Sequence, residues 1–197
     1  MRPDVGGATE ALLDRARRGD ARAFEKLALE VQRPLYRHAA RMVGHDDAED
    51  VVQDALLSAW KSLASFEGTS FRAWVFRIVT NRALDRLRSR RRRPELPLDP
   101  PAEDDDAVGW AEPAAAGPEL ADLAADREAL GVVEEALATL PAEQRAVLLL
   151  RDVEGFAYEE IAIITSTEIG TVKSRIHRGR VAVRNILVSR GWKGSSG

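Results

Sequence analysis

The sequence predicts an all-α protein with two small helical domains joined by a flexible acidic linker, the second domain containing a helix-turn-helix. Apolar residues recur at helical spacing on both sides of residues 94–118, and no stretch shows the apolar–polar alternation of a half-buried strand. Residues 94–118 hold six of the nine prolines and the run Asp104-Asp105-Asp106, a composition that cannot build a core. We therefore expect an N-terminal domain over 1–93, a linker over 94–118 and a C-terminal domain over 119–197.

The N-terminal domain is expected to consist of successive helices. Asp20 can cap a helix, and Pro34 within that helix predicts a kink at that residue or a break just before it. Asp46 followed by Glu49 has the pattern of a capping box for the next helix. The polar loop over residues 66–70 then leads into a long basic helix that ends at the linker.

The C-terminal domain ends in a pair of helices joined by a short turn. Pro141 is expected to open one helix and Gly155 to end it. A short helix over residues 157–164, a turn over 165–167 and a final helix over 169–188 follow. Two such helices, the second rich in arginine and lysine, are typical of a helix-turn-helix.

Composition excludes several classes of function. Because the chain has no cysteine, it can form no disulfide, thiolate metal site or cysteine nucleophile. The three histidines, His38, His45 and His177, lack metal-site spacing, and no phosphate loop or catalytic serine pattern appears. We expect no enzyme activity, cofactor or metal. No apolar run approaches the roughly 20 residues of a membrane span, and the N-terminus has no signal-peptide core, which predicts a cytoplasmic protein without membrane insertion.

Charge is distributed very unevenly along the chain. The net charge of −3 combines ten acidic residues and no Lys or Arg in 94–126 with seven Lys or Arg and no acid from Ile169 onward. A recognition helix in the DNA major groove needs long donors near its N-terminal half, and Gly170 leaves space for a phosphate there. The alternative is a solvated basic face, but the preceding helix and turn favour DNA.

Two further charged segments have competing interpretations. The acids from Asp46 to Asp54 could suggest a metal site, but they lie at a helix N-terminus, lack a glycine-centred calcium loop and have no histidine partner. A protein-contact surface or plain capping is favoured. The run Arg90-Arg91-Arg92-Arg93 fits either a phosphate contact, which is favoured, or a soluble helix end.

Four stretches resemble the extracytoplasmic-function (ECF) sigma factors, in that family's order and spacing. Asp46–Trp60 is similar to the segment that docks on the clamp helices of the polymerase β′ subunit, and Phe71–Arg88 to the −10 element segment. Leu140–Arg151 and Gly170–Arg178 are similar to the −35-binding domain. The chain departs from the family at residues 165–169, Thr-Ser-Thr-Glu-Ile, where members usually have Leu-Gly-Val-Pro-Val.

The resemblance implies three sets of site residues. Those expected to bind polymerase are Asp47, Glu49, Asp50, Gln53 and Asp54. Those expected at the −10 element, where a base is captured from the melted strand, are Phe66, Glu67, Gly68, Thr69, Ser70, Arg77 and Asn81. Those expected to read the −35 element are Gly170, Thr171, Lys173, Ser174, Arg175, His177 and Arg178.

These residues lead to one functional hypothesis and two alternatives. The resemblance implies a bacterial sigma factor that binds core RNA polymerase, through the β′ clamp helices and the β subunit, and melts the −10 region of specific promoters. An anti-sigma factor is a further implied partner. The first alternative is a stand-alone helix-turn-helix regulator, which would leave the first domain unexplained. The second is a helical adaptor with no role in DNA binding.

Overall fold

The computed structural model describes residues 5–68, 70–92 and 127–190. The N-terminal part consists of α1 (Val5–Arg17), α2 (Ala21–Val43), α3 (His45–Ser62) and α4 (Phe71–Arg92), with a short 3₁₀ turn, Leu63–Ser65, after α3. The C-terminal part consists of α5 (Arg127–Thr139), α6 (Ala142–Leu148), α7 (Tyr158–Thr165) and α8 (Ile169–Ser189). The predicted acidic linker, residues 94–118, lies outside the described residues. The all-helical prediction is confirmed, since the described ranges contain no strand.

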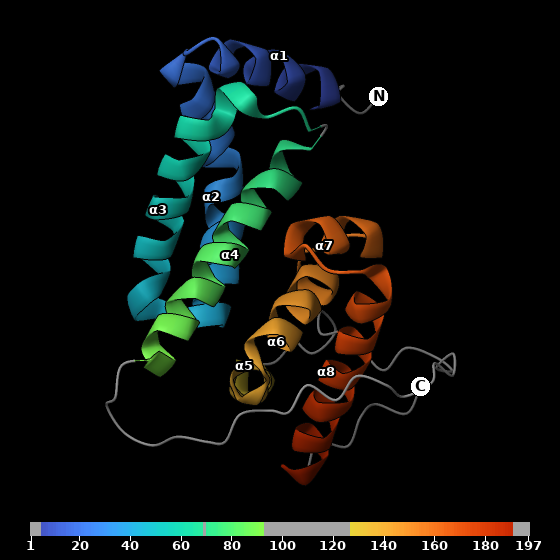
Figure 1. Ribbon diagram of the computed structural model, residues 1–197. Helices are drawn as coiled ribbons and strands as arrows, with labels where there is room; N and C mark the ends of the chain where they lie inside the picture. The colour runs from blue at the N-terminus through green and yellow to red at the C-terminus, as the bar shows by residue number, and fades with distance from the viewer. Residues whose placement is uncertain (1–4, 69, 93–126, 191–197) are drawn as a thin grey trace.

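The N-terminal helices form a bundle in which α2, α3 and α4 run side by side and α1 lies across one end (Figure 1). Apolar side chains at helical spacing bury one face of each helix, which is what holds the bundle together. The fully buried ones include Leu27, Leu35, Met42, Val75, Phe76 and Val79. At the end nearest α1, the ring of Phe24 lies 5.1 Å from that of Trp60 and 6.4 Å from that of Phe71.

Local signals set the ends of these helices, with two corrections. Asp20 caps α2 as predicted, because its carboxylate accepts hydrogen bonds from the backbone N–H groups of Arg22 and Ala23, each at 3.1 Å. Of the two alternatives predicted at Pro34, a kink or a break before it, the break is wrong, since α2 continues through that residue. The capping box predicted at Asp46 is also wrong: α3 begins at His45, directly after Gly44, and no side chain caps it.

The C-terminal core joins α5, α6, α7 and α8. Its largest fully buried side chains are Leu137, Leu148, Leu149, Leu150, Ile161 and Ile164. After α6 the chain widens into one π-helical turn, Leu149–Val153, and Gly155 ends the segment with a φ of 76°. The turn of the helix-turn-helix lies at Ser166, where the sequence predicts it, and adopts a left-handed φ of 54°.

The two domains pack directly on each other, an arrangement that the sequence does not predict. α4 contacts α7 and α6, and α2 contacts α5 and α6 (Figure 1). We call this contact region the interdomain interface. α4 belongs to the segment expected at the −10 element, and α7 is the first helix of the helix-turn-helix expected at the −35 element.

Candidate polymerase and nucleic-acid interfaces

The final helix, α8, is held by a narrow apolar stripe on one side. Val172, Ile176 and Val183 are buried against the domain. The residues predicted to read the −35 element lie on the other sides of its first three turns. Gly170, His177 and Arg178 are exposed, whereas Thr171, Lys173, Ser174 and Arg175 are half-buried. The predicted set therefore lies together on one helix whose opposite side is fixed to the core.

Neighbouring contacts fix the position of α8 within the helix-turn-helix. Arg180 donates to both carboxylate oxygens of Asp152, whose side chain is only 7% exposed. The Lys173 ammonium lies 5.9 Å from the centre of the Tyr158 ring, and the Arg151 guanidinium lies 4.7 Å from the same ring. Arg180 was not among the predicted site residues, and the structure gives it an anchoring role within the domain.

The predicted polymerase-binding residues divide into two groups on α3. Glu49, Asp50, Gln53 and Asp54 are exposed, and the side-chain amide of Gln53 donates to Glu49 at 3.3 Å. Leu57, one turn further along the helix, is also 56% exposed. Sequence reasoning missed it, although an apolar residue beside an acidic cluster is the expected composition of a protein contact.

Asp47 differs from the other four because α4 covers it. Its carboxylate accepts a hydrogen bond from Arg86 at 2.7 Å and forms an ion pair with Arg90, and its side chain is 8% exposed. The hydrogen bond from Arg86 is the main reason that the pKa of Asp47 is lowered, and the Arg90 charge adds to the effect, while burial opposes it. Asp47 therefore joins α3 to α4 in this structure.

The loop predicted to capture a −10 base is built around a buried ring. Phe66 is 8% exposed and stacks on Trp74 at 4.5 Å between ring centres. Arg17 of α1 contacts the backbone of the same residue, donating to the Phe66 carbonyl oxygen at 2.6 Å. The aromatic ring of Phe66 thus belongs to the loop's support, and the exposed residues beside it are Glu67 and Gly68.

The remaining loop residues begin α4. The Ser70 hydroxyl accepts a hydrogen bond from the Ala73 N–H at 3.1 Å, which caps the helix. A Cβ added to Gly68 would lie 2.5 Å from Cε2 of Phe66, so the loop needs glycine there to close over that ring. Thr69 lies outside the described residues.

Arg77 and Asn81 are the predicted −10 residues of α4, and both are exposed one turn apart. Arg77 reaches the other domain, donating to the Ser166 hydroxyl at 3.4 Å. The structure therefore brings the loop, Arg77 and Asn81 to the start and middle of one helix. It also places Arg77 against the turn of the helix-turn-helix.

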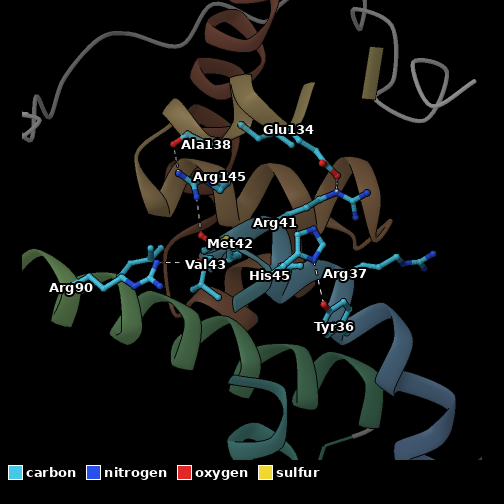
Figure 2. Close-up of a pocket in the computed structure, with 14 residues that line it drawn as sticks. Tyr36, Arg37, Arg41, Met42, Val43, His45, Arg90, Glu134, Ala138 and Arg145 are labelled. Atoms are coloured by element: carbon cyan, nitrogen blue, oxygen red, sulfur yellow. Dashed lines mark hydrogen bonds and ion pairs between the residues drawn. The ribbon is translucent and has the colours of Figure 1, made fainter. Parts of the chain in front are cut away.

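A cavity of about 410 Å³ lies at the other end of the interdomain interface (Figure 2). Four arginines line it, and three of them, Arg41, Arg90 and Arg145, contact acceptors within the described part of the chain. Arg145 donates to the carbonyl oxygens of Met42, Ala138 and Leu140. The remaining contacts are those of Arg90 with the Val43 carbonyl oxygen and of Arg41 with Glu134, at 3.2 and 3.7 Å.

Burial is the main reason that the pKa of Arg145 is lowered, and the nearby Arg91 charge adds to it. The side chain nevertheless stays charged, because arginine begins from a very high pKa. Its contacts join α6 to the end of α2, so the cavity is bounded by side chains that hold the two domains together.

Within the described ranges, no group of three or more His, Asp or Glu side chains could hold a metal ion, and no helix is long and apolar enough to cross a membrane.

Comparison with known families assigns both domains. Residues 27–93 match Sigma-70 region 2, and residues 130–183 match Sigma-70, region 4. The ECF RNA polymerase sigma-E factor of Escherichia coli K12 is 35% identical over 184 residues, covering 89% of this chain and 92% of that protein. The RNA polymerase sigma-H factor of Pseudomonas aeruginosa is 38% identical over 187 residues, covering 90% of this chain and 93% of that protein.

Solved structures agree with this assignment. The sigma factor RpoE from Bartonella quintana, in complex with the anti-sigma factor NepR, is 33% identical with a TM-score of 0.63, covering 84% of this chain and 96% of that one. CnrH, in complex with the cytosolic domain of CnrY, is 26% identical with a TM-score of 0.65, covering 92% and 98%. With a region 2 domain, a region 4 helix-turn-helix and relatives matched over nearly their full length, the chain belongs to the extracytoplasmic-function family of RNA polymerase sigma factors, which are transcription initiation factors.

Proposed function

We propose that this chain binds core RNA polymerase, directs it to specific promoters and melts the −10 region. The observation that carries the proposal is the geometry of α8. Its basic side chains lie around the first turns of a helix whose other side is anchored in a domain that matches Sigma-70, region 4. Long donors there can reach guanine edges and phosphates in a major groove.

The exposed acidic face of α3 is the proposed contact with polymerase. The exposed Leu57 lies on the same helix, within about two turns of Glu49, Asp50, Gln53 and Asp54. Charged residues around an apolar contact favour a specific, oriented encounter. The β′ clamp helices are the proposed partner of this face, and the β subunit is a second proposed contact for the chain.

The loop before α4, together with Arg77 and Asn81, is the proposed −10 site. Glu67, Gly68 and Ser70 form a small polar rim beside the buried Phe66 ring. Such a rim suits a base that has left the stack, because unstacking a base costs a few kcal/mol that must be offset by specific contacts. Thr69 is included in the proposal from its place in the sequence.

Three further expectations complete the proposal. The chain acts in the cytoplasm by binding and not as an enzyme, as expected of a member of a family of transcription initiation factors. An anti-sigma factor regulates it. The relative RpoE is found in complex with the anti-sigma factor NepR, which supports this part of the proposal by likeness.

Run-off transcription with core polymerase tests the proposal on a panel of promoters. The double variant Asp50→Lys/Asp54→Lys should lose transcription and affinity for core polymerase, because it reverses the charge of the proposed contact. Glu25→Lys/Glu30→Lys is the matched control, since both residues are exposed on α2. The polymerase assignment fails if the α3 double variant binds core with wild-type affinity.

A stand-alone helix-turn-helix regulator would behave differently in the same assays. It would bind promoter duplex without polymerase, and a pull-down with core would recover nothing. The N-terminal domain's match to Sigma-70 region 2 favours the polymerase-dependent function.

A further inference from the structure

The cavity at the interdomain interface is separate from the surfaces proposed for DNA and polymerase (Figure 2). Residues of α2, α4, α5 and α6 line it, together with the start of α3, and its volume is about 410 Å³. Pockets that bind small molecules have volumes of roughly 300–1,000 Å³. None of the residues predicted to bind polymerase, the −10 element or the −35 element lines this cavity. Its side chains therefore need an explanation of their own.

The lining of the cavity is strongly cationic. It contains four arginines and one acid, which are Arg37, Arg41, Arg90, Arg145 and Glu134. Glu134 lies 3.7 Å from Arg41 and its side chain is 51% exposed, so solvent screens much of its charge. The lining therefore carries more positive than negative charge, which favours an anion.

Two acids that lie near the lining do not remove this excess, because each is shared with another arginine. Asp47 forms an ion pair with Arg90, but it also accepts a hydrogen bond from Arg86 at 2.7 Å. Glu154 is paired with Arg72 at 3.0 Å. Both acids thus neutralise arginines that lie outside the lining.

Arg145 has only neutral groups among its hydrogen-bond acceptors in the described residues. Its guanidinium donates to the carbonyl oxygens of Met42, Ala138 and Leu140, and its Nε is buried without a hydrogen-bond partner in that part of the chain. The carbonyl end of a helix carries only about half an elementary charge. A full positive charge on Arg145 is therefore not balanced by these contacts, and an anion in the cavity can balance it.

The start of α3 adds to the attraction for an anion. Gly44 and His45 line the cavity, and no side chain caps the helix at Gly44. The first N–H groups of a helix carry partial positive charge and need acceptors from outside the helix. Asp46 and Asp47 lie in the same turn, but neither lines the cavity.

Apolar and aromatic side chains form another part of the lining. Met42, Leu87 and Leu137 contribute apolar surface. Tyr36 is 37% exposed, and its ring lies 6.2 Å from that of His45. An accessible aromatic ring can stack on a planar ring of a ligand. A molecule with both an anionic group and a planar ring therefore matches the lining better than a simple ion does.

We propose that this cavity binds a small phosphorylated molecule with a planar ring, the chemical class of a nucleoside diphosphate. The arginines and the start of α3 hold the phosphate, while Tyr36 and the apolar side chains hold the ring. Phosphate suits several arginines better than carboxylate does, because it carries roughly −1.5 to −2 charges and three acceptor oxygens. The ligand contacts both domains, since each contributes to the lining.

Calorimetry on the full chain tests the ligand class with ADP, pyrophosphate and adenosine. ADP should bind, pyrophosphate should bind about tenfold more weakly because it lacks the stacked ring, and adenosine should not bind detectably. ADP should also raise the melting temperature, since it binds the folded chain. On addition of ADP, the backbone amide signals of Gly44 and Ala138 should shift in nuclear magnetic resonance spectra, because both residues line the cavity.

Two variants with a matched control locate the binding site. Arg37→Gln/Arg41→Gln should weaken ADP binding about tenfold or more, because it removes two guanidinium groups from the lining. Arg22→Gln/Arg33→Gln removes the same charge from exposed positions of α2 outside the lining, and should change the affinity less than about twofold. Ala138→Trp keeps every charge and fills the cavity, so it should abolish binding. Circular dichroism checks that each variant remains helical.

Four results would overturn the proposal. The first is no binding of ADP at millimolar concentration, and the second is equal weakening by the two arginine double variants, which indicates nonspecific attraction. The third is wild-type affinity for ADP in Ala138→Trp. The fourth is tighter binding of a poly-glutamate peptide than of ADP, which identifies a protein-contact surface instead. Equal affinity for pyrophosphate and ADP would overturn the role of the ring. Because no measurement involves polymerase or promoter DNA, this site and the proposed function are tested independently.

Discussion

The two basic helices, α4 and α8, look alike in sequence and differ in what their cations contact. On α8, Arg180 pairs with Asp152 of its own domain, while His177 and Arg178 remain exposed. On α4, several arginines reach other helices. Their partners are Glu154 for Arg72, Ser58 for Arg82, Asp47 for Arg86 and Arg90, and Glu143 for Arg88. A basic sequence therefore indicates possible nucleic-acid binding, but intramolecular partners decide how much charge is available.

The largest effect expected from this comparison concerns the ion pairs that Asp47 of α3 forms with arginines of α4. Asp47→Ala should destabilise the protein by about 1–3 kcal/mol, because it removes the charged hydrogen bond from Arg86 and the ion pair with Arg90. Asp50→Ala, exposed three residues further along α3, should change stability by less than about 0.5 kcal/mol. Urea denaturation of both variants measures the difference.

The same residue predicts a pH dependence. The pKa of Asp47 is lower in the folded chain than the unfolded value of about 3.9. Its contribution to stability is therefore fully present above the unfolded pKa and is lost as pH falls through the folded pKa. The difference in unfolding free energy between wild type and Asp47→Asn should stay constant near neutral pH and shrink below about pH 4. A difference that does not change in acid would show that the carboxylate is not held by Arg86.

A second, smaller effect distinguishes a residue of α8 proposed to contact DNA from one that holds the helix in its domain. Arg175→Ala should weaken −35 duplex binding by about 1–3 kcal/mol and relax specificity at one base pair, without lowering the melting temperature. Arg180→Ala should instead lower the melting temperature, because it leaves the nearly buried Asp152 without its partner. Footprinting together with thermal melting distinguishes the two. If Arg175→Ala changes only stability, α8 does not read the −35 element in the proposed way.

The smallest expected effect lies in the turn that joins α7 to α8. Ser166 has a left-handed φ of 54° at the position where the family usually has glycine. Ser166→Gly should stabilise the domain by about 0.5–1 kcal/mol, because glycine adopts this conformation without the Cβ penalty. Ser166→Ala should not stabilise it, and it serves as the control for loss of the hydroxyl that Arg77 contacts. Thermal unfolding of the two variants gives the comparison.

The sequence by itself determined the local features of this protein. The helical spacing of apolar residues located the helices, Asp20 gave the start of α2, and the turn between α7 and α8 lies where the sequence predicted one. It also identified an acidic segment in α3 and a basic helix near the end of the chain. These features depend on interactions within about one or two turns of helix, which a linear pattern contains.

Only the tertiary structure decided which predicted site residues are available. Asp47 and Phe66 each lie beside predicted site residues that are exposed, but contacts with Arg86 and Arg90 cover Asp47 and the ring of Trp74 covers Phe66. The contacts responsible join residues far apart in sequence, 39 positions for Arg86 and Asp47, and 82 for Arg72 and Glu154. Pairing a particular arginine with a particular acid requires the helices to be placed first. That placement comes from burial of apolar area, which is non-directional, so the sequence pattern shows which face of a helix is buried but not which helix covers it.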